Sequence, residues 1–226
     1  MAKKTTTVET TGGEHVVISA PNMRTVSFLI EGDTPYVQNK FSGKARGIMR
    51  AKQEAGSTGG KNKKREAKDF LECCEEAKHY SDEGWIGLPA SGFRLAAISA
   101  CRVVGFKMTI AKLSIFIEAD GFDKDDGTPL VKITKGEPRY AEHAVRNETG
   151  VCDIRPRPLW NPGWQAVVRM RFDADQFTVA DVSNLMARIG CQVGIGEGRP
   201  DSKKSGGMGW GLFHLKNDAN GSKGNP

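Results

Sequence analysis

The sequence contains no run of about 18 apolar residues, the length that a membrane-spanning helix requires, so we expect no membrane span. The first residues, MAKKTTTVETTGGEH, lack the apolar core of a secretory signal peptide, which favours a cytoplasmic protein. The five cysteines form no CxxC pair, and Cys73 and Cys74 are adjacent, a spacing that suits neither a zinc site nor a relaxed disulfide. We therefore expect free thiols.

Signatures of common catalytic sites are also missing. There is no GxSxG, HExxH or GxxxxGK[ST] motif, and the four histidines are scattered along the chain. The run DKDDG at 123–127 is similar to the start of a calcium loop, but no glutamate stands at the twelfth position, so we interpret it as an acidic turn. Asp33, which follows a predicted strand, is interpreted as a turn former. The sequence therefore predicts no metal, no cofactor and no enzyme activity.

The chain does contain enough apolar material for a core, with 38% hydrophobic residues among 226. Its formal net charge of +6 is unevenly distributed. The segment from Lys40 to Lys68 holds ten basic and two acidic residues, a local balance of +8, and includes the flexible run GSTGG. This segment is interpreted either as a basic arm that binds phosphates or as a solvated loop that the following acidic stretch neutralises.

Arginine is the only strong cation between Lys135 and Lys203. Guanidinium groups bind phosphates bidentately and stack on bases, which an ammonium does less well. Arg169 and Arg171 alternate with apolar residues and therefore share one face of a predicted strand. The alternative is that these arginines form ion pairs with nearby carboxylates.

Periodicity and turn residues give the expected elements. Ser91 and Thr178 are the expected helix caps, with Asp181 completing a capping box and Gly190 ending the second helix. The segment 154–160 contains two prolines and is predicted to be an edge strand or a loop. Strands are predicted at 25–31, 84–89, 113–119, 164–172, 191–196 and 210–215, a β-hairpin addition at 128–134 and 139–147, and helices at 91–104 and 178–189.

Without its insertions this order is βαββαβ, the ferredoxin-like or RRM-like plan of an α+β protein, with the basic insertion between the first strand and the first helix. One domain is expected over 23–215, with a flexible insertion at 40–68 and disordered ends at 1–22 and 216–226. Such a sheet leaves one face open, where single-stranded nucleic acid often binds.

The stretch 194–211, GIGEGRPDSKKSGGMGWG, is rich in glycine and carries Arg199, Lys203 and Lys204. Glycine lets a backbone approach a ligand closely, and backbone N–H groups with nearby cations can cradle phosphates. The other interpretation is a long hairpin loop whose glycines serve bends.

Three segments together resemble the RAMP superfamily, whose RRM-fold subunits include the backbone protein of CRISPR effector complexes. They are IEGDTPY at 30–36, GLPASGFRLAAISACR at 87–102 and the glycine-rich stretch with the last strand, 194–215. The chain is also similar to a group of bacteriophage proteins of this length, in which an aromatic residue stands where this chain has Gly198. The catalytic carboxylate of target-cleaving relatives has no counterpart at 37–40, which reads VQNK.

The resemblance implies that the glycine-rich loop and the first helix hold RNA or single-stranded DNA, while the basic insertion acts as a thumb between neighbouring subunits. The predicted nucleic-acid-binding residues are Lys40, Lys44, Arg46, Arg50, Lys61, Lys63, Lys64, Arg65, Ser91, Arg94, Gly196, Arg199, Lys203, Lys204, Gly207 and Trp210.

The leading hypothesis is a phage-encoded, non-catalytic protein that coats single-stranded nucleic acid as a homo-oligomer or filament. Three alternatives stay open. The chain could be a strand-annealing recombination protein, an endoribonuclease that uses Asp33 or a histidine, or an inhibitor that docks on a host CRISPR complex.

Overall fold

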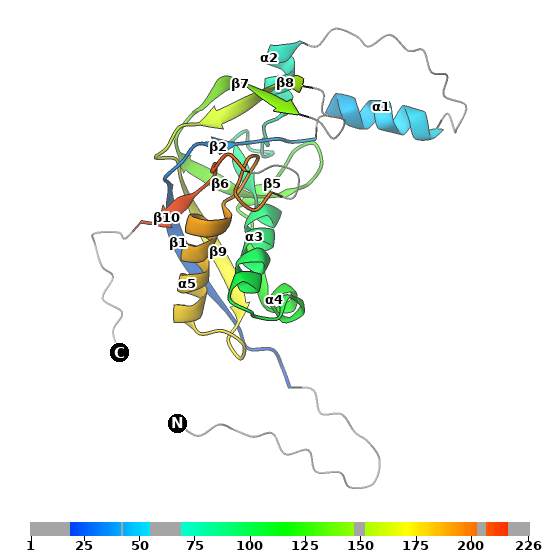
Figure 1. Cartoon of the computed structure of the whole chain (residues 1–226). Coiled ribbons are helices and arrows are strands. Elements are labelled where there is room, and N and C mark those ends of the chain that lie inside the picture. The colour runs from blue at the N-terminus through cyan, green and yellow to red at the C-terminus, as the bar shows by residue number, and fades with distance from the viewer. Residues whose placement is uncertain (1–18, 42, 55–68, 147–151, 203–206, 217–226) are drawn as a thin grey trace.

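The computed structural model describes residues 19–41, 43–54, 69–146, 152–202 and 207–216 (Figure 1). Within these residues five α-helices and two antiparallel sheets confirm the expected α+β class. The helices are α1 (Gly43–Glu54), α2 (Phe70–Glu76), α3 (Ala90–Val103), α4 (Met108–Ser114) and α5 (Val179–Arg188), and α5 continues into a π-helical segment, η1 (Ile189–Val193). The strands are β1 (Met23–Gly32), β2 (Tyr36–Val37), β3 (Gly87–Pro89), β4 (Ile115–Glu118), β5 (Gly121–Phe122), β6 (Pro129–Lys135), β7 (Pro138–Arg146), β8 (Cys152–Trp160), β9 (Gln165–Asp173) and β10 (Phe213–Leu215).

The larger sheet is built around β1 and β9. β1 lies between β9 and β10 and is antiparallel to both. On the other side of β9, β4 pairs with its second half and β6 pairs with its first residues. β3 extends the sheet beyond β6, and β5 pairs with the other edge of β6. The strand order through the centre is therefore β10-β1-β9-β4.

The two faces of this sheet have different environments. Along β9 the side chains of Ala166, Val168, Met170 and Phe172 are buried, whereas Arg171 between them is exposed. Strand periodicity explains this alternation, because successive side chains point to opposite faces. Helices α3 and α5 cover the buried face in Figure 1, and their apolar side chains join the strands in the main hydrophobic core.

The two predicted core helices are confirmed with changes at their ends. The Thr178 side chain and Asp181 form the expected capping box of α5. Ser91 does not cap α3, because the helix already begins at Ala90 and its cap position is Pro89. Gly190 does not end α5. A Cβ there would lie 2.0 Å from the carbonyl oxygen of Phe213, so this glycine permits close packing on β10 while the chain continues helically.

The smaller sheet has the order β2-β8-β7. The predicted hairpin between 128–134 and 139–147 is therefore wrong in its pairing, since β6 joins the larger sheet and β7 pairs with β8. Between them Gly136 has a φ of +99° and packs against Trp160 and Trp164, so the chain turns there into the second sheet.

β8 is a regular strand despite Pro156 and Pro158. The carbonyl oxygen of Pro158 accepts a hydrogen bond from the Gln38 N–H, which places this backbone edge on the side away from β7. The backbone N–H and C=O of one residue point to the same side of a strand. The N–H groups that the two prolines lack would therefore have pointed away from β7, and no hydrogen bond to β7 is lost.

Three further predictions are corrected by the structure. Residues 191–196 are not a strand, because η1 runs to Val193 and Gly194 then turns the chain with a φ of +71°. The strand predicted at 113–119 is shorter, since α4 extends to Ser114. Part of the insertion predicted to be flexible at 40–68 is the helix α1, while residues 55–68 lie outside the described residues.

All five cysteines are free thiols, as expected. Among the described residues, none of the helices combines the length and the apolar character that crossing a bilayer demands. The expectation of disordered ends concerns mainly residues 1–18 and 217–226, which are outside the described residues.

Candidate nucleic-acid interface

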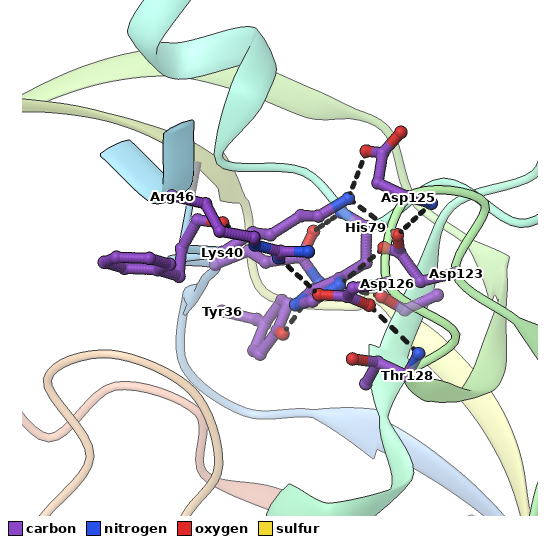
Figure 2. A network of polar contacts seen from close by, with 11 residues as sticks. Tyr36, Lys40, Arg46, His79, Asp123, Asp125, Asp126 and Thr128 are labelled. Carbon is purple, nitrogen blue, oxygen red and sulfur yellow. Dashed lines mark hydrogen bonds and ion pairs between the residues drawn. The ribbon is translucent and has the colours of Figure 1, made fainter. Parts of the chain in front are cut away.

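Lys40 lies at the centre of a network of charges that we call the Lys40 cluster (Figure 2). Its ammonium donates hydrogen bonds to Asp123 at 2.7 Å and to Asp125 at 2.6 Å, and the side chains of Lys40 and Asp123 are 4% and 0% exposed. The backbone N–H of Lys40 also bonds to the carbonyl of Ala77. The members of the cluster are Lys40, Arg46, His79, Asp123, Asp125 and Asp126.

Burial and pairing act against each other on the pKa values of the cluster. Burial alone would raise the pKa of Asp123, but hydrogen bonds from Lys40, the backbone and His79 lower it. Burial alone would lower the pKa of Lys40, but its two carboxylate partners raise it. Both groups are therefore charged at neutral pH.

His79 completes the cluster as a neutral ring. Burial lowers its pKa more than Asp123 raises it. The ionised Asp123 can only accept hydrogen bonds, so the His79 Nδ1, 2.7 Å away, carries the proton.

His79, Asp123 and Asp126 offer ligand atoms within 4.8 Å of one another, a spacing that could hold a metal ion. The ammonium of Lys40 already supplies the positive charge at Asp123. The arrangement is therefore explained as an internal cation paired with carboxylates. The acidic run at 123–127 is visible in the sequence, but its contact with His79 is not, because 44 positions separate His79 from Asp123.

The burial of Lys40 corrects its assignment as a phosphate-binding residue. Two other cations of the insertion are also paired, Arg46 with Asp126 at 2.9 Å and Arg50 with Glu54 at 2.9 Å. Arg50 remains 81% exposed. The side chain of Lys44 and the residues Lys61, Lys63, Lys64 and Arg65 lie outside what the structure describes.

The glycine-rich loop packs mainly against the chain itself. A Cβ on Gly196 would lie 2.6 Å from the carbonyl oxygen of Val37, and one on Gly207 would lie 2.9 Å from that of Arg199. Gly211 is the tightest case, with its Cβ position 1.8 Å from the carbonyl oxygen of Ile195. Internal close packing therefore explains these glycines without a bound phosphate.

Arg199 and the aromatic ring of this loop also contact the chain itself. The Arg199 guanidinium donates to the carbonyl of Gly196. Trp210 is half-buried, lies 4.6 Å from the His143 ring and packs against the small cluster of Val37, Ala141 and Leu159. Lys203 and Lys204 lie outside the described residues.

The two residues predicted on the first core helix have different surroundings. Ser91 is exposed near the start of α3. Arg94 donates hydrogen bonds to the carbonyl groups of Ile115 and Lys112, which attaches α3 to the end of α4 and the start of β4. Its guanidinium carbon also lies 5.3 Å from the centre of the Phe116 ring.

Phe116 lies on a surface of β1, β4 and β9, three strands that contain none of the predicted binding residues. It belongs to the sheet face opposite α3 and α5, which we call the open face and which carries Thr25, Ser27, Phe116, Glu118, Arg169 and Arg171. The register aligns Thr25, Arg171 and Phe116 in one row across β1, β9 and β4. The Arg171 guanidinium carbon lies 5.3 Å from the Phe116 ring centre. The alternation of Arg169 and Arg171 was the sequence signal for this face.

The next row on the open face is balanced in charge. Arg169 is 2.8 Å from Asp120 and 3.8 Å from Glu118, so it forms the ion pairs that the alternative interpretation expected. Within the described part of the chain no carboxylate pairs with Arg171, which is exposed. Arg171 is therefore the arginine of this strand that remains available to a ligand.

A second arrangement lies at the other end of β1. The His214 Nδ1 is 2.7 Å from the Asp33 carboxylate, and both side chains are about half exposed. Two backbone hydrogen bonds to the carbonyl of Leu212, from Asp33 and Thr34, hold this turn against the last strand.

Comparison with models of protein families finds no family that matches the chain, and comparison with curated proteins finds no match.

Proposed function

We propose that the protein is a non-catalytic protein that coats single-stranded RNA or DNA as a repeated subunit, with an RRM-like core. The strand order β10-β1-β9-β4 and the placement of α3 and α5 on one face support this core. β7 and β8 with β2 form the addition to it. Membership of the RAMP superfamily and a cytoplasmic location remain predictions from the sequence.

The observation that carries the proposal is the row of Thr25, Arg171 and Phe116 on the open face. A ring flanked by two guanidinium groups offers planar groups on which a base can stack and a positive charge for the phosphate beside it. Every base has a flat face, so binding of this kind tolerates any sequence.

Arg94 and Arg171 contribute differently to this row. Arg94 is held by two backbone carbonyl groups and therefore fixes the position of the ring. Arg171 pairs with no carboxylate among the described residues. Its guanidinium is therefore the group expected to contact phosphate.

The experiment is a fluorescence anisotropy titration of a labelled oligouridine and a labelled oligothymidine over a series of salt concentrations. We expect binding that weakens steeply with salt. Phe116→Ala should cost about 1–3 kcal/mol of binding free energy through lost stacking. Arg171→Ala should also reduce the salt slope by about 0.7, the value of one phosphate contact on a single strand.

Arg188→Ala on α5 is the matched control, because it removes the same charge from the helical layer. It should bind like the wild type. Equal affinity of the wild type, Phe116→Ala and Arg171→Ala at low salt would refute the assignment of the open face.

A second candidate function is metal-independent cleavage of RNA, which the Asp33 and His214 pair favours. Asp33 orients the ring through Nδ1, which leaves Nε2 to accept a proton from a ribose 2′-hydroxyl. The 2′-oxygen would then bond to the adjacent phosphorus while the bond from phosphorus to the 5′-oxygen breaks, and the 5′-oxygen would take a proton from water. Cleavage of RNA that is lost in both His214→Ala and Asp33→Asn would establish this activity. Intact RNA after prolonged incubation would exclude it.

A further inference from the structure

Helix α1 is rooted firmly in the molecule but extends away from both sheets (Figure 1). At its root Lys40 is tied to Asp123 and Asp125, and Arg46 is tied to Asp126. The outer part of the helix points away from α2 of the same chain. Helix α1 is therefore held at its N-terminal end and presents its outer part to the surroundings.

The amino-acid composition of α1 does not by itself explain why this helix is stable. Isolated helices shorter than about 12–15 residues are marginal in water, and an interior glycine such as Gly47 costs about 1 kcal/mol. The first turn carries no acidic residue to interact with the helix dipole. Ile48 and Met49 are nonetheless 51% and 50% exposed on this helix. A surface that covers them would stabilise α1.

Helix α2 has the complementary properties. Its sequence FLECCEE and its cap Asp69 supply four acidic residues and no basic one, whereas α1 supplies Lys44, Arg46, Arg50 and Lys52 against the single acid Glu54. Leu71 is 71% exposed on α2, and Phe70 is 36% exposed. The opposite side of α2 is engaged with the body, where Cys74 is buried.

We infer that α1 of one copy docks on α2 of a second copy of this chain. The contact would cover Ile48 and Met49 with Leu71 and Phe70, and would place basic residues of α1 beside acidic residues of α2. A second copy is the occupant because this chain itself provides the acidic and apolar surface that α1 lacks. The inference rests on the proposed function only in that a coat needs contacts between copies.

The test is the molar mass of nucleic-acid-free protein, measured by sedimentation equilibrium over a range of protein and salt concentrations. We expect the wild type to associate beyond the monomer. Arg50→Glu and Glu76→Arg should each raise the dissociation constant of self-association by about tenfold or more, because each places like charges together. The variant with both changes should associate like the wild type, since opposite charges face each other again.

Arg188→Glu is the control for net charge and should leave self-association unchanged. A wild type that is monomeric at all concentrations would overturn the inference. Failure of the combined variant to recover, while each single variant remains folded by circular dichroism, would also overturn it.

Oligonucleotide binding tests the proposed function separately from self-association. Leu71→Ala, which removes apolar surface from the proposed contact and changes no charge, should keep the wild-type affinity for an oligonucleotide that fits one copy. Intact self-association with no binding of any oligonucleotide would refute the proposed function and leave the inference standing.

Discussion

Two cationic regions of the molecule use their charge in opposite ways. In the Lys40 cluster the ammonium is buried between Asp123 and Asp125, and its charge stabilises the fold at the root of α1. On the open face the Arg171 guanidinium is exposed over Phe116 and faces solvent. A basic residue buried between carboxylates therefore stabilises the fold, whereas an exposed one without a carboxylate partner is a candidate for contact with phosphate.

The largest expected effect is the loss of stability when the buried Lys40 is replaced. Lys40→Met leaves the Asp123 carboxylate buried without its cation and should lower the free energy of unfolding by about 3 kcal/mol. Urea denaturation followed by circular dichroism measures this loss. Adding Asp123→Asn to Lys40→Met should restore part of it.

The control is Lys124→Met, which removes the neighbouring but exposed cation. It should change stability by less than about 0.5 kcal/mol. Equal losses for the two lysines would mean that burial does not distinguish them.

A second prediction concerns the glycine-rich loop, where Gly209 and Gly211 have nearly the same φ, +71° and +72°. A Cβ on Gly209 meets no atom within 4 Å, whereas one on Gly211 meets the Ile195 carbonyl oxygen. Gly209→Ala should cost about 1 kcal/mol for its backbone conformation alone. Gly211→Ala should cost about 2 kcal/mol more through overpacking.

Thermal unfolding of the two alanine variants measures this difference. Equal melting temperatures would show that internal packing does not require a glycine at position 211. Phosphate binding would then again be the better explanation for the glycines of this loop.

The third prediction is a pH dependence of stability that depends on Asp126. Burial alone would raise the pKa of this carboxyl, but hydrogen bonds with Thr128 and Arg46 lower it from 3.8 to about 2. A carboxyl with a lowered pKa stabilises the fold when ionised. Its contribution, about 1–2 kcal/mol, is therefore complete near neutral pH and is lost as the pH falls toward 2.

Denaturant titrations at a series of acidic pH values measure this dependence. Asp126→Asn should be less stable near neutral pH and should lose less stability on acidification. A parallel decline of the variant and the wild type would show that Asp126 does not titrate in this way.

The smallest expected effect on stability is that of replacing Arg171 on the open face. Arg171→Ala should change the free energy of unfolding by less than about 0.5 kcal/mol, because the side chain is exposed and stabilises no buried group. Urea denaturation of this variant beside Lys40→Met completes the comparison. A large loss of stability in Arg171→Ala would mean that this cation, like Lys40, serves the fold.

Much of the fold could be predicted from the sequence. The strand at 164–172 and the capping box at Thr178 are local signals, and the structure confirms both. The pairing of β7 with β8 could not be predicted, because nothing near residue 136 shows which sheet each strand joins. Helix α1 was not predicted either, since its charged residues and glycines are also typical of loops.

The candidate site was harder to predict for a related reason. Charge can be counted along the chain, but its neutralisation depends on distant residues such as Asp123, which pairs with Lys40 across 83 positions. The row of Thr25, Arg171 and Phe116 likewise joins three strands far apart in sequence. The alternation of Arg169 and Arg171 identified the face of the strand, but not which arginine would be paired.

The most direct test of the open face is photo-crosslinking of the protein to an oligonucleotide that carries a photoreactive uracil, followed by mass spectrometry of the crosslinked peptides. The account predicts that the crosslinks fall on Phe116 and on its neighbours in β4 and β9. Crosslinks confined to α5 or to the glycine-rich loop, with none on the open face, would contradict it.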